Sequence, residues 1–282
     1  MIKDKKEILR EVKNAMKVLD DYSGGEEELL CMMTLNLSRE KFFIKEKFNQ
    51  KEYDKIKKVL NERLKNKPLN KIFKKQTFFG IDFFINNNVL APRVETEILA
   101  EMVLKEINKG TKRVLDLCCG SGCIGLTLSI KILNKVEFVL SDISEKALYV
   151  ARKNRKLLNQ NAVRIVKSDL FRGLKKDKKF DIIVCNPPYI KSKDIETLSK
   201  GVKNFDPHIA LDGGKSGLEF YEKIAQNVTN FLTEKGKIFL EIGFDEKEDV
   251  QNIFNKNGFI TKCYKDFSGQ DRVVEIKRGS YD

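Results

Sequence analysis

The sequence predicts an α/β protein in which a parallel, doubly wound sheet ends in an antiparallel hairpin and is preceded by a small helical domain. Beyond Gly110, short apolar runs alternate with helical patterns, which is typical of a parallel sheet covered on both faces. The last two apolar runs are separated only by the turn at residues 268–271, and strands joined by a short turn pair antiparallel. Residues 2–75 instead show helical periodicity without strand signals. We therefore divide the chain into an N-terminal helical domain (1–75), a β-hairpin linker (76–91) and an α/β domain (92–282).

Composition is that of an ordinary soluble protein. The 282 residues are 41% hydrophobic and 34% charged, which is enough to bury a full core. No apolar run approaches the roughly 20 residues that a membrane helix needs, and the first residues lack the apolar core of a signal peptide. We expect a cytoplasmic monomer with no membrane partner.

The net charge of +13, from 54 Lys+Arg against 41 Asp+Glu, would suit an acidic partner such as a nucleic acid or a ribonucleoprotein. The excess is spread along the chain rather than gathered in one arginine-rich stripe. Direct binding of nucleic acid is therefore not required by the charge pattern.

The N-terminal domain is predicted as a bundle of four or five helices. Apolar residues at helical spacing begin it: Ile8, Val12, Ala15, Met16 and Leu19. After the break at Ser23-Gly24-Gly25, the same pattern predicts helices over residues 26–33, 39–48 and 53–64. Ser38 can serve as an N-cap and Pro68 as a stop. Such a bundle slightly favours a role in substrate recognition.

Two short runs rich in phenylalanine surround Gly80 and predict the hairpin linker. A helix is then expected after Pro92, with Ile98, Leu99, Met102 and Val103 on one face. In the α/β domain the apolar pattern predicts strands over residues 113–118, 136–140, 163–167, 180–185, 237–242, 259–264 and 272–276. Helices are predicted over residues 123–133, 145–158 and 246–257.

A glycine loop follows the first strand of the α/β domain. Gly120-Ser121-Gly122 and Gly125 form a GxGxxG pattern between a strand and a helix. The second strand ends at Asp142, 22 residues after Gly120, where a carboxylate can accept both hydroxyls of a ribose. A nucleoside-containing cofactor is the better interpretation, although a tight strand-to-helix turn alone would give the same glycines.

The residues around the loop favour S-adenosylmethionine over NAD. Asp116, four residues before Gly120, is placed where its carboxylate can face a cationic amino-acid group, and NAD has no such group. The terminal antiparallel hairpin also suits a methyltransferase sheet better than a six-stranded dinucleotide fold.

The six cysteines show no CxxC pair and are expected to be reduced thiols. Cys118, Cys119 and Cys123 could be imagined as metal ligands. However, adjacent strand residues point to opposite faces, and the only histidine is His208, so packing is favoured and no metal is expected.

The tetrapeptide Asn186-Pro187-Pro188-Tyr189 follows the apolar strand at residues 180–185, at the sheet edge where ligands of open α/β folds bind. The Asn186 side-chain oxygen and the Pro187 carbonyl can accept the two hydrogens of an NH₂ group. Pro188 stiffens the loop together with Pro187, and Tyr189 offers a face for a planar group. We expect Asn186, Pro187 and Tyr189 to act in catalysis on an amide or amine nitrogen. Two prolines that simply end a strand are the alternative.

This chemistry does not call for a base. Two acceptors on its hydrogens would localise the lone pair of a planar nitrogen and aim it at a sulfonium methyl, so the proton can leave late. His208 is then expected to be a local hydrogen-bonding residue.

With these motifs assembled, the chain resembles the HemK/PrmC family of peptide chain release factor glutamine methyltransferases over nearly its whole length. Further segments that carry the resemblance are Phe79-Gly80, Pro92-Arg93-Val94-Glu95-Thr96-Glu97, Ser168-Asp169-Leu170-Phe171, Asp206-Pro207-His208-Ile209-Ala210-Leu211, Gly213-Gly214-Lys215-Ser216-Gly217-Leu218-Glu219-Phe220-Tyr221, and Asp266-Phe267-Ser268-Gly269 before Arg272-Val273-Val274. The family usually has proline at the position of Val94 and glutamate at that of Asp206. Neither difference affects a residue to which we assign a catalytic or binding role.

The resemblance implies a Rossmann-like class I methyltransferase sheet and methyl transfer to the glutamine of a release factor's Gly-Gly-Gln loop, which modulates translation termination. It also implies an N-terminal domain that helps to dock the release factor. It implies these site residues: Cys118, Cys119, Gly120, Ser121 and Gly122 along the cofactor, Asp142 on the ribose, Asp169 and Leu170 beside the adenine, and Asn186 to Tyr189 around the glutamine, with Asn186 also next to the cofactor.

Other functions remain open at this point. Enzymes that methylate ribosomal-protein glutamine or the exocyclic amines of nucleic-acid bases use the same Asn-Pro-Pro-Tyr tetrapeptide. From different classes, a cofactor-binding protein without catalysis or an NAD-dependent oxidoreductase would also contain the glycine loop. Retention of Asn186 and Tyr189 argues against a protein without catalysis.

Overall fold

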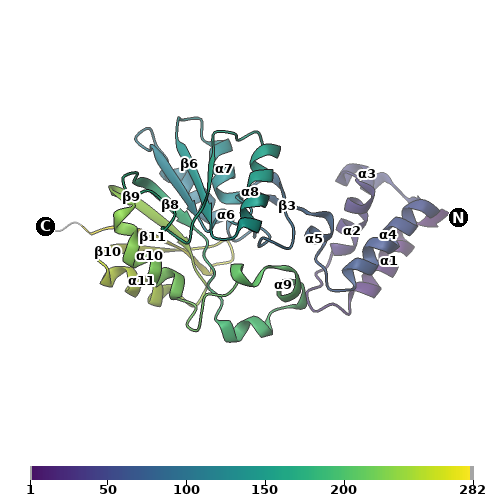
Figure 1. The fold of residues 1–282 in the computed structure, drawn as a ribbon. Helices are drawn as coiled ribbons and strands as arrows, with labels where there is room; N and C mark the ends of the chain where they lie inside the picture. The colour runs from purple at the N-terminus through teal and green to yellow at the C-terminus, as the bar shows by residue number, and fades with distance from the viewer. Residues whose placement is uncertain (1, 280–282) are drawn as a thin grey trace. The chain divides into compact units, whose positions relative to one another are not determined.

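A computed structural model of the chain describes residues 2–279, which form two compact units (Figure 1). One unit runs up to Lys74 and also includes Thr197–Phe205. The other comprises Lys75–Glu196 and the chain from Asp206 onward. Within the described range, no helix is both long enough and apolar enough to cross a membrane.

The first unit is a helical bundle around an apolar core. Its helices are α1 (Lys5–Met16), α2 (Glu26–Leu35), α3 (Arg39–Ile44), α4 (Gln50–Arg63), α5 (Leu69–Phe73) and α9 (Lys200–Phe205). Ile8 of α1, Leu30 of α2 and Leu60 of α4 are almost fully buried in this core. Ser38 caps α3 by accepting a hydrogen bond from the Lys41 amide, as predicted.

The bundle differs from the prediction at two places. The helix expected over residues 39–48 ends at Ile44, and β2 (Lys47–Asn49) pairs antiparallel with β1 (Ile2–Asp4). The reason lies in Asn49, which caps α4 in a reciprocal capping box with Glu52 and must itself be extended, so the chain before it leaves the helix. The prediction for Pro68 was also wrong, because Pro68 begins α5 and does not end α4.

Thr197–Phe205 lies in sequence within the segment assigned to the α/β domain, yet it packs in the helical unit. The Lys200 amide donates to Asp20 Oδ2 at 3.3 Å. A Cβ atom on Gly201 would collide with the Asp21 carboxylate, so a larger residue here would displace that side chain. The Asp21 carboxylate also pairs with the buried Arg63 at 2.5 Å.

The second unit contains a seven-stranded sheet in the order β10-β11-β9-β8-β5-β6-β7. Its strands are β5 (Arg113–Leu117), β6 (Glu137–Asp142), β7 (Arg164–Lys167), β8 (Phe180–Cys185), β9 (Leu232–Glu241), β10 (Phe259–Lys265) and β11 (Asp271–Arg278). Strands β7, β6, β5, β8 and β9 run parallel, and β11 is antiparallel to both β9 and β10. The parallel sheet and its terminal hairpin are confirmed.

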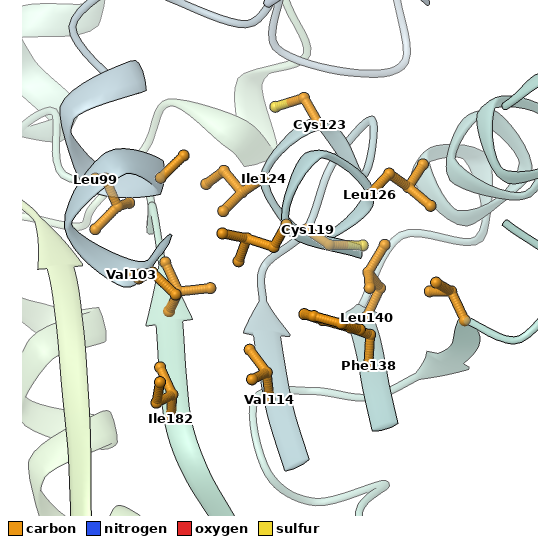
Figure 2. Packing of buried hydrophobic residues seen from close by; sticks show 14 of the residues in the cluster. Leu99, Val103, Val114, Cys119, Cys123, Ile124, Leu126, Phe138, Leu140 and Ile182 are labelled. Carbon is orange, nitrogen blue, oxygen red and sulfur yellow. The ribbon is translucent and has the colours of Figure 1, made fainter. Parts of the chain in front are cut away.

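Helices cover both faces of this sheet (Figure 1). One face packs against α6 (Glu97–Glu106), α7 (Cys123–Lys131) and α8 (Glu145–Leu157), and the other against α10 (Glu219–Asn227) and α11 (Lys247–Lys256). Figure 2 shows Val114, Phe138 and Ile182 of the strands packing toward Leu99, Val103 and Ile124 of the helices. The next residue along β5, Leu115, packs on the opposite face, as the two-residue period of a strand requires.

The linker forms the predicted hairpin from β3 (Lys75–Phe78) and β4 (Ile81–Phe84). Asn154 of α8 ties it to the glycine loop: its Oδ1 accepts from the Phe84 amide at 2.8 Å, and its Nδ2 donates to the carbonyls of Phe84 and Ser121, both at 2.9 Å. Asn154 is 1% exposed, so these bonds are shielded from water. Short 3₁₀ helices complete the chain at η1 (Ser192–Thr197), η2 (His208–Ala210) and η3 (Val228–Asn230).

Candidate active site

A cavity of about 310 Å³ lies in the second unit at the carboxyl ends of the parallel strands. The residues predicted for the site that line it are Cys118, Cys119, Gly120, Ser121, Asp142, Asp169, Leu170, Asn186 and Pro188. Four other predicted residues do not line it: Asp116, Gly122, Pro187 and Tyr189. The sheet thus brings the glycine loop and the start of the Asn-Pro-Pro-Tyr segment to one cavity.

The glycine loop turns the chain from β5 into α7. Gly120 has φ +53°, and a Cβ atom built on it would meet nothing within 4 Å, so the space beside its backbone is open. Gly125 has the opposite environment, because a Cβ atom there would lie 2.6 Å from Leu140 Cδ1 and 2.9 Å from Asp116 Oδ2. The first glycine thus leaves room beside the cavity, and the last allows α7 to pack against the sheet.

Asp142 lies at the end of β6 with both carboxylate oxygens engaged by backbone amides. Oδ2 accepts from the Gly120 amide at 2.9 Å and Oδ1 from the Ser144 amide at 2.8 Å. Burial raises the pKa of Asp142, although the hydrogen bonds from these amides act to lower it. Each oxygen retains a further lone pair, so the carboxylate can also accept hydroxyl groups from a ligand in the cavity.

Asp116 lies behind the loop and is 1% exposed. Its Oδ2 accepts from the Gly125 amide at 2.8 Å, while Oδ1 has no hydrogen-bond partner among residues 2–279. Burial raises the pKa of this carboxyl to about 7. In this structure Asp116 holds the first turn of α7 in place, and its predicted contact with a cationic group remains a prediction.

Asn186 follows β8 and its side chain is anchored on one side. Its Nδ2 donates to Thr96 Oγ1 at 3.3 Å. The Tyr189 hydroxyl lies 3.4 Å from Glu241 Oε1, and burial raises the pKa of the tyrosine. Thr96 and Glu241 are each only 2% exposed, and burial raises the pKa of Glu241 to about 7. A threonine and a carboxyl therefore lie directly behind the Asn186–Tyr189 segment, which is predicted to bind an amide.

Sequence reasoning missed several residues of the cavity wall. Arg93 and Thr96 line it from the segment before α6, and Ile209, Phe220 and Lys223 line it from the region after α9. Arg93 Nη2 lies 3.4 Å from Asp206 Oδ2, which joins these two segments. The motifs at residues 92–97 and 206–221 were noted only for their resemblance to a family, because no residue pattern assigned them a chemical role.

Comparison with known proteins agrees with this geometry. A family model described as "Methyltransferase small domain" matches residues 93–204. The release factor glutamine methyltransferase of Clostridium botulinum is 41% identical over 233 residues, which cover 81% of this chain and 82% of that protein. The enzyme of the same name from Clostridium acetobutylicum is 43% identical over 224 residues, which cover 78% of each chain. The chain belongs to the release factor glutamine methyltransferase family.

The fold agrees with that membership. A crystal structure of a methyltransferase from Pyrococcus furiosus superposes with a TM-score of 0.54, covering 78% of this chain and 98% of that one, at 24% identity. The predicted class I methyltransferase fold is therefore confirmed. The relatives confirm the assignment of the chain as a methyltransferase.

Cys118, Cys119 and Cys123, considered in the sequence as metal ligands, line the cavity, whereas His208 does not. All six cysteines are free thiols, and burial raises the pKa values of Cys119, Cys123 and Cys185. Among residues 2–279, no group of three or more His, Cys, Asp or Glu side chains is arranged to hold a metal. The His208 side chain is 68% exposed, lies 3.7 Å from Asp212 and does not line the cavity.

Proposed function

We propose that this protein transfers a methyl group from S-adenosylmethionine to the side-chain amide nitrogen of the glutamine in the Gly-Gly-Gln loop of peptide chain release factors, and so modulates translation termination in the cytoplasm. The observation that carries the proposal is that Asn186 lines the same cavity as Gly120 and Asp142. An amide held at Asn186 would lie next to a cofactor held at the loop. The membership of the chain in the release factor glutamine methyltransferase family supports this substrate.

The cofactor fits the residues present. The open space beside Gly120 admits a ligand close to the backbone, and the Asp142 carboxylate can accept the two ribose hydroxyls. Asp169 and Leu170 line the cavity where we place the adenine. When bound, S-adenosylmethionine supplies an electrophilic methyl group whose bond to sulfur breaks, with its electron pair staying on sulfur, as the bond to nitrogen forms.

The protein's part is to hold and orient the amide. The lone pair of an amide nitrogen is delocalised into the carbonyl, so the nitrogen is a weak nucleophile. Asn186 Oδ1 and the Pro187 carbonyl would accept its two hydrogens, which localises the lone pair and stabilises the positive charge that develops during transfer. The nitrogen then loses one proton to water after the new bond has formed, so no histidine is needed. Pro187 and Pro188 would keep the segment rigid, and Tyr189 would offer a face to the planar amide.

Transfer of labelled methyl to a purified release factor tests the proposal. Wild-type enzyme should label the native Gly-Gly-Gln loop and not a Gln→Ala loop. Asn186→Ala should lower the rate on the order of a hundred-fold or more, as loss of a single transition-state hydrogen bond does in other enzymes. Asn252→Ala, at an exposed asparagine of α11, is the matched control and should keep the wild-type rate.

Two outcomes would contradict the assignment. Labelling of a ribosomal protein or a nucleic acid instead of the release factor would overturn the substrate. Stabilisation of the protein by NAD but not by S-adenosylmethionine, measured as a thermal shift, would overturn the chemistry itself.

A further inference from the structure

Three residues distant in sequence meet behind the amide-binding segment. Thr96 is the N-cap of α6, Asn186 follows β8, and Glu241 ends β9. β8 and β9 are paired in parallel with Cys185 opposite Leu240, so Asn186 and Glu241 leave the sheet side by side. The arrangement therefore comes from the sheet register and not from local sequence.

The orientation of the Asn186 amide decides whether it can bind a substrate amide. Its two ends are nearly equal in size, but Oδ1 only accepts and Nδ2 only donates hydrogen bonds. A substrate NH₂ group needs an acceptor, so an Asn186 side chain rotated by half a turn would place two donors against each other. Something in the protein must hold Nδ2 away from the substrate.

Thr96 does this if its hydroxyl proton points elsewhere. Asn186 Nδ2 donates to Thr96 Oγ1 at 3.3 Å, which uses a lone pair of that oxygen. The Glu241 carboxyl lies next to Thr96, whose hydroxyl opposes the rise of the Glu241 pKa. Within the described part of the chain, Glu241 Oε2 is buried and makes no hydrogen bond, so it can accept one from Thr96. Because an ionised carboxylate can only accept, the proton of such a bond would come from Thr96.

We propose that Thr96 and Glu241 are positioning residues, which set the Asn186 amide with Oδ1 toward the substrate through a directed chain of hydrogen bonds from Asn186 to Thr96 to Glu241. This inference rests on the proposed role of Asn186 as the acceptor for the substrate amide. The two positioning residues act on Asn186 and do not themselves hold the reacting nitrogen.

The direction of the chain depends on the charge of Glu241. Several groups face this carboxyl: Thr96, Tyr189, Arg272 and Glu95 by their side chains, and Tyr221, which donates to the Glu241 carbonyl at 3.0 Å and also lies 3.3 Å from Glu246. Burial outweighs the positive charge of Arg272 and raises the pKa of Glu241 to about 7. Once protonated, Glu241 can donate to Thr96, and Thr96 can then donate to Asn186 Oδ1, which turns the amide. Transfer should therefore be full above this pKa and lost as pH falls through it.

Steady-state transfer to the release factor, with Thr96→Val and Thr96→Ser compared at pH 8, tests the hydrogen-bond chain. Thr96→Val keeps the shape but removes the hydroxyl, and kcat should fall about 10- to 100-fold. Thr96→Ser restores the hydroxyl and should recover kcat to within about three-fold of wild type. Both variants should stay folded at the assay temperature and should still bind S-adenosylmethionine, which a thermal melt and isothermal titration calorimetry check. A wild-type kcat in a folded, cofactor-binding Thr96→Val protein would overturn the inference, and so would equal losses in the two variants.

The pH profile adds a readout that a merely structural role would not move. Wild-type kcat should decline below about pH 7, whereas Glu241→Gln should have a lowered kcat that does not depend on pH over this range. An unchanged acidic limb in Glu241→Gln would contradict the role of Glu241.

NMR separates failure of this inference from failure of the proposed function. With asparagine labelled in its side-chain amide and the Asn186 signal assigned by its loss in Asn186→Ala, the Asn186 NH₂ resonances should titrate near pH 7 in wild type. They should not titrate in Glu241→Gln or Thr96→Val. This result is expected whichever acceptor the enzyme methylates, and absence of the titration in wild type would overturn the hydrogen-bond chain.

Discussion

Asp142 ends β6 and Asn186 follows β8, the two strands on either side of β5, yet different kinds of partner hold their side chains. The two oxygens of Asp142 accept from the backbone amides of Gly120 and Ser144. The amide of Asn186 donates instead to the Thr96 side chain, which we propose is oriented in turn by Glu241. The half of the site that we assign to the cofactor is thus held by main chain, and the half that we assign to the substrate is held by side chains.

This difference has a physical consequence. A backbone N–H can only donate, so the orientation of Asp142 does not depend on which side chains or protons are present. A hydroxyl donates or accepts according to its neighbours, so the orientation of Asn186 can change with one substitution or with pH. We expect the cofactor half to be robust and the substrate half to be sensitive.

Asn154→Ala tests the one place where a side chain supports the cofactor half. Asn154 makes three buried hydrogen bonds to the backbone of Phe84 and Ser121. Its removal leaves those groups unpaired and should lower the free energy of unfolding by about 2–4 kcal/mol in urea denaturation. Asn252→Ala on exposed α11 is the matched control and should stay within about 0.5 kcal/mol of wild type. If Asn154→Ala also lowered the free energy of unfolding by no more than about 0.5 kcal/mol, the contact between the hairpin and the loop would not contribute to stability.

The contrast between the two halves also explains which features of the site could be predicted from the sequence. The glycine loop and Asp142 are local features: three closely spaced glycines follow one strand, and the carboxylate ends the next. The sheet strands were predicted for the same reason, because apolar runs such as Phe180–Cys185 report burial directly. The family resemblance, which rests on such local motifs, is confirmed by the relatives.

Non-local features escaped prediction. Thr96 and Asn186 are 90 residues apart, and only the packing of α6 against the sheet brings them together. Thr197–Phe205 joins the helical unit through close contacts at Gly201, which no sequence pattern indicates. Strand β2 was missed because a three-residue strand before a helix carries the same apolar spacing as a helical turn. The chemical roles assigned to the site residues remain predictions.

Asp116→Asn sharpens the comparison through the pH dependence of stability. Burial raises the folded-state pKa of Asp116 to about 7, above the 3.8 of an exposed aspartate. A raised pKa contributes stability that is fully present below the unfolded pKa and is lost as pH rises through the folded pKa. The contribution of Asp116 should therefore decline between about pH 4 and pH 7. Asn keeps the acceptor for the Gly125 amide but carries no charge, so it avoids this loss.

The variant should consequently be more stable than wild type at pH 8, on the order of 1–3 kcal/mol, and similar to it at pH 4. Urea denaturation at the two pH values measures this difference. An equal difference at both values would mean that Asp116 does not change its charge in this range. If the variant also binds S-adenosylmethionine more weakly, the predicted contact of Asp116 with a cationic group gains support.

Asp142→Asn should have the smallest energetic effect of these variants. It tests whether cofactor binding and kcat depend on different residues of the site. The nitrogen of the amide cannot accept a hydrogen bond, so one of the two backbone donors and one ribose hydroxyl lose their partner. The dissociation constant for S-adenosylmethionine should rise about 10-fold, equivalent to about 1.4 kcal/mol, in isothermal titration calorimetry. At saturating cofactor kcat should stay close to wild type, because the substrate amide is held elsewhere. Thr96→Val should show the reverse pattern, with unchanged cofactor affinity and lowered kcat. If both variants change the same parameter, the two halves do not act separately.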